Sequence, residues 1–270
     1  MWIDTHCHLD AAEFDGQQEA LSQAAALEGV SLIVIPAIAA CNFGRVAELT
    51  RQYPNCVYAL GIHPLLTPQA EERDLDILQQ AIASALDDPR FVAIGEIGLD
   101  YFVPELQQGA LREKQEHFFA AQLKLAQQFA LPVLLHVRRS QDIVLKYLRR
   151  HPAPGGIAHA FNGSEQQAQR FIDLGFKLGF GGAMTFPRAL QIRRLAAGLP
   201  LEALVLETDA PDISPAWLHP AHNTPQQTAR IGAVLAQLRG MTPQDVAQAT
   251  TANARAAMPR LAALMDSALP

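Results

Sequence analysis

The chain has 270 residues, 49% of them hydrophobic, and a formal net charge of −6. This length exceeds that of an average domain but is usual for a β/α barrel, and the apolar content is sufficient for a large core. An acidic chain lacks the basic surface of a protein that coats nucleic acid. An enzyme that acts on nucleic acid is not excluded, because bound metal could supply the positive charge.

The cysteines and the N-terminus indicate the cellular compartment. Cys7, Cys41 and Cys56 are widely spaced and form no Cys-x-x-Cys pair, which is typical of a reduced intracellular protein. The N-terminus has no secretion signal, and no apolar run reaches the roughly 18 residues that a membrane-spanning helix needs. We therefore expect a soluble, cytoplasmic protein with no membrane contact.

Short apolar runs alternate along the chain with longer amphipathic stretches, as strands alternate with helices. In chain order, the expected elements are an opening strand that ends with His6 and His8, helix 17–28, strand 31–36, helix 42–52, strand 56–61, helix 71–86, strand 91–96, helix 107–129, strand 132–136, helix 142–149, strand 156–159, helix 165–174, strand 176–179, helix 187–197, strand 203–207, and helices 225–238 and 243–257. No linker, repeat or low-complexity tract interrupts this order. The pattern predicts an α/β protein with one (β/α)8 TIM barrel, a single domain over residues 1–270.

Residues able to bind metal stand where the predicted strands end. His6 and His8 have a spacing that places both imidazoles on one face of a strand, whereas on a helix they would point about 200° apart. The other strand ends carry His63, Glu96, His136, His159 and Asp209. The carboxyl ends of barrel strands share one mouth, where active sites are built. Such a set suits one or two ions of zinc, manganese, iron, cobalt or nickel, and the two oxygens of Glu96 could bridge two ions.

Several other residues have mainly structural interpretations. Cys7 is expected to pack on the opposite face from His6 and His8. Asp10 and Asp100 are interpreted as loop or capping residues, and His117 and His151 as surface residues. His219 and His222 follow the last strand and could contact a substrate.

Six motifs resemble, in order, those of the TatD family of metal-dependent hydrolases, which are amidohydrolase-like barrels and include metal-dependent DNases. The motifs are His6-Cys7-His8, Gly61-Ile62-His63-Pro64, Gly95-Glu96-Ile97-Gly98-Leu99-Asp100, Leu131-Pro132-Val133-Leu134-Leu135-His136-Val137-Arg138, His159-Ala160-Phe161-Asn162-Gly163 and Glu207-Thr208-Asp209-Ala210-Pro211. The resemblance covers almost the whole chain. The segment from His219 to Pro225 is most similar to the branch of that family called YjjV.

The resemblance implies two divalent metal ions per chain, which could be Zn, Mn, Fe, Co, Ni or Mg. The implied ligands of the first ion are His6, His8, Glu96 and Asp209, and those of the second are Glu96, His136 and His159. The implied catalytic residues are Asp209, Glu207, His63 and Arg138. On this hypothesis Asp209 is the general base, while His63 and Arg138 help the metal ions to neutralise the phosphate oxygens. Glu207 either faces the barrel beside Asp209 or holds an imidazole from behind.

The function expected from these residues is hydrolysis of phosphodiesters, in DNA or a small substrate, by a metal-activated water. Without a basic groove, a short footprint on single-stranded ends is expected, as in a 3'-5' exonuclease. One alternative is hydrolysis of small esters, lactones or amides, although many related barrels carry a lysine where this chain has Glu96. Another alternative is a barrel that binds a partner without catalysis. It predicts that residues unable to bind metal have replaced the ligands, yet every ligand position in the motifs holds a residue that can bind metal. We expect a monomer or weak oligomer.

Overall fold

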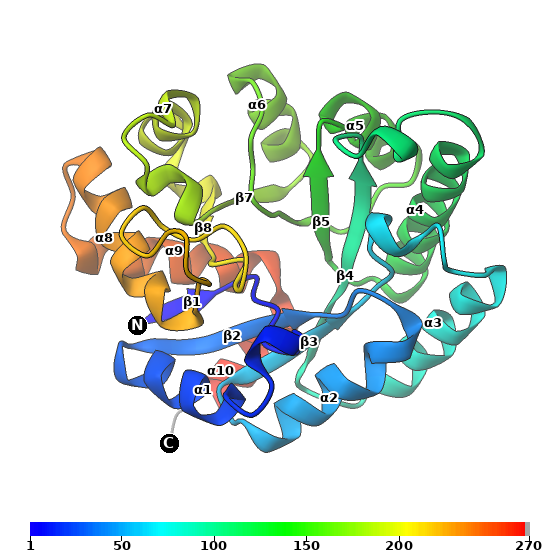
Figure 1. Cartoon of the computed structure of the whole chain (residues 1–270), viewed down its shortest axis with the longest axis horizontal. Coiled ribbons are helices and arrows are strands. Elements are labelled where there is room, and N and C mark those ends of the chain that lie inside the picture. The colour runs from blue at the N-terminus through cyan, green and yellow to red at the C-terminus, as the bar shows by residue number, and fades with distance from the viewer. Residues whose placement is uncertain (268–270) are drawn as a thin grey trace.

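Eight strands, almost entirely buried, form a parallel sheet that curves into a nearly closed barrel (Figure 1). The computed structural model describes residues 1–267. The strands are β1 (Trp2–Asp4), β2 (Val30–Pro36), β3 (Cys56–Leu60), β4 (Phe91–Asp100), β5 (Val133–Arg138), β6 (Gly156–Ala158), β7 (Phe176–Phe180) and β8 (Leu204–Leu206). Their spatial order equals their chain order, and consecutive strands pair in parallel. The predicted (β/α)8 architecture is confirmed.

The helices lie outside the strands and follow them around the barrel (Figure 1). They are α1 (Gln18–Leu27), α2 (Phe43–Gln52), α3 (Glu72–Ala85), α4 (Gly109–Phe129), α5 (Gln141–Arg150), α6 (Glu165–Asp173), α7 (Leu190–Gly198), α8 (Thr228–Arg239), α9 (Pro243–Ala257) and α10 (Pro259–Ser267). Some bounds differ from the expected ones, such as the start of α8 at Thr228 instead of residue 225. Helix α7 begins at Leu190 instead of residue 187, after a turn in which Ala189 N donates to Phe186 O, and α10 was not predicted. Within residues 1–267, no helix has the length and apolarity to cross a membrane.

The end of the barrel at which the strands begin is closed by apolar side chains. The barrel interior, including Leu32, Val57 and Val92, forms one apolar cluster with Met258 and Leu261 of the α9–α10 segment. The guanidinium of Arg260 donates to the backbone oxygens of Leu86, Asp88 and Phe91, which fixes α10 beside the start of β4. The opposite end, where the strands finish, therefore remains as the mouth that polar residues can line.

The first and last strands approach one another through hydrogen bonds at their carboxyl ends. Thr5 donates to Leu206 O from both its backbone nitrogen and its hydroxyl, each at 3.0 Å. The buried carboxylate of Asp4 accepts from the nitrogen of Thr208 at 2.9 Å and from its hydroxyl at 2.6 Å. These contacts align the residues after β1 with those after β8.

Candidate metal centre

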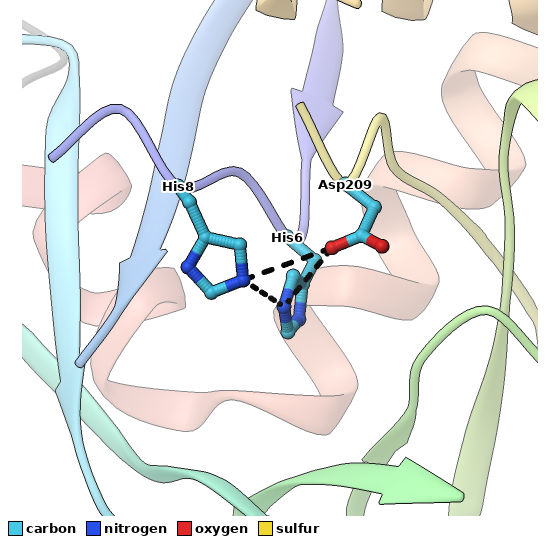
Figure 2. Close-up of side chains that lie close together, drawn as sticks. All are labelled: His6, His8 and Asp209. Carbon is cyan, nitrogen blue, oxygen red and sulfur yellow. Dashed lines mark hydrogen bonds and ion pairs between the residues drawn. The ribbon is translucent and has the colours of Figure 1, made fainter. Parts of the chain in front are cut away.

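His6, His8 and Asp209 are brought together by this junction. Asp209 N donates to His6 O, and His8 N donates to Ala210 O, each at 2.8 Å. Asp209 Oδ1 lies 3.6 Å from Nε2 of His6 and 3.7 Å from Nε2 of His8. Figure 2 shows the two imidazoles and the carboxylate pointing toward a common centre. Asp209 has a left-handed backbone, φ 56°, a conformation that aspartate adopts more readily than most residues.

Glu96 is directed into the barrel from an irregular part of β4. The strand was expected to end at Glu96 but continues to Asp100, with a shift in register against β5 between Ile94 and Ile97. This shift adds one residue to β4, and such bulges redirect side chains beside active sites. A Cβ at Gly95 would lie 2.6 Å from the Cβ of Leu134, so only glycine fits there. The bulge thus gives Glu96 its place at the centre of the site.

The two oxygens of Glu96 face different sets of imidazoles. Oε2 lies 3.1 Å from Nε2 of His6 and 3.3 Å from Nε2 of His8. Oε1 lies within hydrogen-bonding distance of one ring nitrogen in each of three further imidazoles, at 3.2 Å from His63, 2.9 Å from His136 and 2.9 Å from His159. The carboxylate of Glu96 therefore lies between the pair His6 and His8 and the other three imidazoles.

These side chains form three overlapping groups that could hold metal ions. Within each group the candidate ligand atoms lie within 4.8 Å of one another. The groups are His6–His8–Asp209, His6–Glu96–His159 and His63–Glu96–His136. All six residues predicted as metal ligands occur in them. His63 was predicted to lie outside the ligand sets, yet it is as close to Glu96 as the others are.

The chemistry of this donor set fits metal ions better than a hydrogen-bonded network. Imidazole nitrogens face one another, with 3.3 Å between Nε2 of His6 and of His8 and 3.1 Å between His63 Nε2 and His136 Nδ1. A single carboxylate cannot accept from every imidazole around it and leave each nitrogen satisfied. Nitrogen and carboxylate lone pairs that converge in this way are typical ligands of divalent transition metals.

The electrostatics of the cluster are dominated by Glu96. Burial favours its neutral form, but the imidazoles of His63, His159 and His6 outweigh burial and hold its pKa well below the usual range. Burial likewise opposes protonation of His8 and His159, but the hydrogen bonds and charge of Glu96 raise the pKa of His8 to about 9 and that of His159 to about 10. The pKa values of His6 and His63 fall to about 3 and 4, mainly through burial. Protons on His8 and His159 thus balance the negative charge of Glu96. Bound metal cations would take over this role.

Asp100 contributes to the site, which its interpretation as a capping residue did not include. Its Oδ1 does accept from the backbone nitrogens of Phe102 and Val103, but its Oδ2 lies 3.0 Å from Nε2 of His136. This contact leaves Nδ1 of His136 facing Glu96. The β-strand period could have indicated the role, because Glu96 and Asp100 are four residues apart on one strand.

Glu207 lies behind His159. Its Oε1 accepts from Ala160 N and lies 3.9 Å from Nδ1 of His159, which is too long for a hydrogen bond. Its Oε2 and His159 Nδ1 are buried and have no hydrogen-bond partner among residues 1–267. Burial raises the pKa of Glu207 to about 8. Glu207 belongs to none of the three candidate metal groups found among the described residues.

The remaining candidates lie around the mouth or away from it. Arg138 is exposed, with its Nη1 3.9 Å from Asp100 Oδ2. His219 and His222 line a separate pocket of about 650 Å³. Pro211, two residues after Asp209, also lines this pocket. Three further residues behave as expected: Cys7 packs in the core, Asp10 accepts from a loop asparagine, and exposed His117 contacts Glu72.

Comparison with known proteins identifies the family. Residues 3–259 match the model of the TatD-related DNases. The chain is 44% identical to an uncharacterized metal-dependent hydrolase, YjjV of Escherichia coli K12, over 93% of this chain and 95% of that protein. The crystal structure of the E. coli YjjV protein superposes with a TM-score of 0.90, at 43% identity over 96% of this chain and 98% of that one. Human deoxyribonuclease TATDN3 is 29% identical over 98% of this chain and 97% of its own. The chain therefore belongs to the TatD family of metal-dependent hydrolases.

Proposed function

We propose that this chain is a deoxyribonuclease that hydrolyses phosphodiester bonds from the 3' ends of single-stranded DNA with two divalent metal ions. The observation that carries the proposal is the position of Glu96, whose two oxygens face separate sets of imidazoles. A carboxylate placed in this way can bridge two cations, as in many sites that cleave phosphodiesters. The relationship to a protein named deoxyribonuclease supports the same reaction.

The family motifs and the contacts of Glu96 together suggest two ligand sets. The first would comprise His6, His8, Glu96 and Asp209, and the second Glu96, His136 and His159, while His63, which contacts the same oxygen of Glu96, would remain available to the substrate. Divalent ions at such a site supply Lewis acidity toward a phosphoryl oxygen and lower the pKa of a coordinated water. The chain supplies the remaining functions from residues at the rim of the same mouth.

Asp209 would accept the proton of the attacking water, because its carboxylate faces the centre of the cluster and is partly open to the mouth. His63 is held by Leu65 N, which donates to Nδ1 at 3.1 Å and leaves Nε2 facing the site. Neutral His63 would therefore donate a hydrogen bond from Nε2 to the leaving oxygen and stabilise its developing charge. The exposed guanidinium of Arg138 would pair with a phosphate oxygen. Glu207 lies behind His159 and would position its ring only after the distance of 3.9 Å between them closes to a hydrogen bond.

The expected substrate follows from the charge of the protein. With 27 acidic and 21 basic residues, the chain has a net charge of −6, which does not favour tracking of a long strand through its phosphates. Positive charge at the mouth would come from the metal ions and Arg138, which suits the end of a single strand. Binding of this kind should weaken as salt rises.

The test is cleavage of a single-stranded oligonucleotide labelled at one end or the other, with and without chelator and re-added metal. A 3'-5' exonuclease shortens the 5'-labelled oligonucleotide stepwise and releases the 3' label at once. The His6→Ala/His8→Ala double variant should lose this activity, whereas the control His117→Ala should keep it, because His117 is exposed, pairs with Glu72 of α3 and belongs to none of the candidate metal groups among the described residues. Cleavage of esters, lactones or amides but not of DNA would replace the proposal with the alternative substrate class.

A further inference from the structure

An exposed aromatic ring with two arginines over it lies beside the candidate metal centre. Phe102 follows β4 and is 42% exposed, which is unusual for a large apolar side chain. The guanidinium carbon of Arg138 lies 3.7 Å from the centre of its ring, and that of Arg139 lies 4.7 Å from it. Arg138 is the last residue of β5, Arg139 follows it, and both are exposed. The three residues form what we call the Phe102 cluster.

The cluster is fixed to the candidate metal centre. Asp100 accepts from Phe102 N at 2.7 Å through one oxygen and contacts His136 through the other. Tyr101 N donates to Arg138 O at 2.8 Å, so the two strands remain paired up to the cluster. The position of Phe102 is therefore set by the carboxylate that also positions His136.

Arg139 adopts a backbone conformation that needs an explanation. Its φ is +56°, in the left-handed region that residues with a Cβ other than asparagine and aspartate rarely occupy. Strain of this kind clusters at functional sites, where the surrounding structure maintains it. Here it accompanies a guanidinium that lies over Phe102 instead of extending into solvent.

We propose that Arg139, held over the ring of Phe102, binds the phosphate of the polynucleotide next to the one being cleaved, while Arg138 contacts the cleaved phosphate itself. An exposed guanidinium beside the mouth of an acidic chain is complementary to a phosphate in charge and hydrogen-bonding geometry. Stacking on the ring restricts both arginines before the substrate arrives, which reduces the entropy lost on binding. Arg139 contacts the substrate away from the reacting bond, and Phe102 is a positioning residue for both arginines. This inference rests on the proposed nuclease function and specifies a polymeric substrate instead of a small phosphodiester.

The experiment compares two substrates, a single-stranded oligonucleotide and bis(4-nitrophenyl) phosphate, which has no neighbouring phosphate. For Arg139→Gln, we expect the KM of the oligonucleotide to rise about three- to tenfold, as for one lost hydrogen bond to a charged group. The plot of log affinity against log salt should become shallower by about 0.7. The kcat on both substrates and the KM of the small one should not change. Phe102→Leu should raise the KM of the oligonucleotide less, and Phe102→Tyr should preserve it.

The matched control is Arg149→Gln, because Arg149 is equally exposed but lies at the far end of α5. An oligonucleotide KM that stays constant in Arg139→Gln, or a small substrate that is slowed equally, overturns the inference. If the wild type cleaves no DNA, the nuclease proposal fails, and fluorescence anisotropy with a labelled oligonucleotide in chelator then tests the cluster independently. Binding that is weaker in Arg139→Gln than in Arg149→Gln supports the cluster, and equal binding rejects it.

Discussion

Replacing Asp100 with asparagine should loosen His136 without changing the metal ligands themselves. The carboxylate uses Oδ2 for Nε2 of His136 and Oδ1 for the backbone nitrogens of Phe102 and Val103. Asparagine has only one side-chain oxygen. In either orientation of the amide, its NH2 group faces a hydrogen-bond donor, which is either His136 Nε2 or the backbone nitrogens of Phe102 and Val103. If His136 loses its partner, its ring no longer holds Nδ1 toward Glu96.

The expected size of the effect can be estimated from this geometry. Removing a partner that orients a histidine ligand lowers metal affinity about 10- to 100-fold. This corresponds to about 1.4–2.8 kcal/mol of binding free energy. We expect Asp100→Asn to lose that much affinity in a competition titration with a metal-sensitive dye, and to lose hydrolytic activity at limiting metal that excess metal partly restores.

The control variant is Asp88→Asn. Asp88 also accepts from a backbone nitrogen, that of Arg90 at 2.9 Å, and from a side chain, the hydroxyl of Tyr58 at 3.0 Å, but it lies at the opposite end of β4. It should lower stability without changing metal affinity. If Asp100→Asn binds metal as tightly as the wild type while remaining folded by circular dichroism, the assigned role of Asp100 in positioning His136 is refuted.

Three further predictions follow from the same contacts. Metal binding at pH 7 should release protons, because the pKa values of His8 and His159 are raised to about 9 and 10 and both must lose a proton to bind metal. Calorimetry of metal binding in buffers with different ionisation enthalpies measures this release. A heat of binding that is independent of the buffer would contradict the prediction. Burial raises the pKa of Glu207 from 4.5 to about 8, so the metal-free fold should lose stability as pH rises between these values. Glu207→Gln should reduce that loss in thermal melts, and an unchanged pH profile would exclude Glu207 as its source. Met258→Ala should cost about 2–5 kcal/mol of unfolding free energy by opening a cavity at the closed end of the barrel, with metal affinity unchanged; a change in affinity would show that the two ends are coupled.

The sequence allowed the barrel and the polar strand ends to be predicted because both depend on local pattern. An apolar run followed by histidine or glutamate is visible at β1, β4 and β5, and the barrel brings such ends together. His6, His8 and Glu96 were located for this reason, and they do lie together in the structure.

What the sequence did not indicate depends on contacts between distant segments. The bulge that directs Glu96 inward arises from the pairing of β4 with β5. Asp4 meets Thr208 across 204 positions of the chain. Helix α10 is a short segment of nine residues, and its place is defined by the apolar cluster and by Arg260. No local pattern carries this information.

The measurement that most directly tests the central proposal is the metal content of the purified protein together with its cleavage of single-stranded DNA. The bridging position of Glu96 predicts about two divalent ions per chain and release of nucleotides that chelator abolishes and added metal restores. Cleavage that persists without metal, or about two bound ions with no cleavage of DNA under any metal, would contradict the proposal.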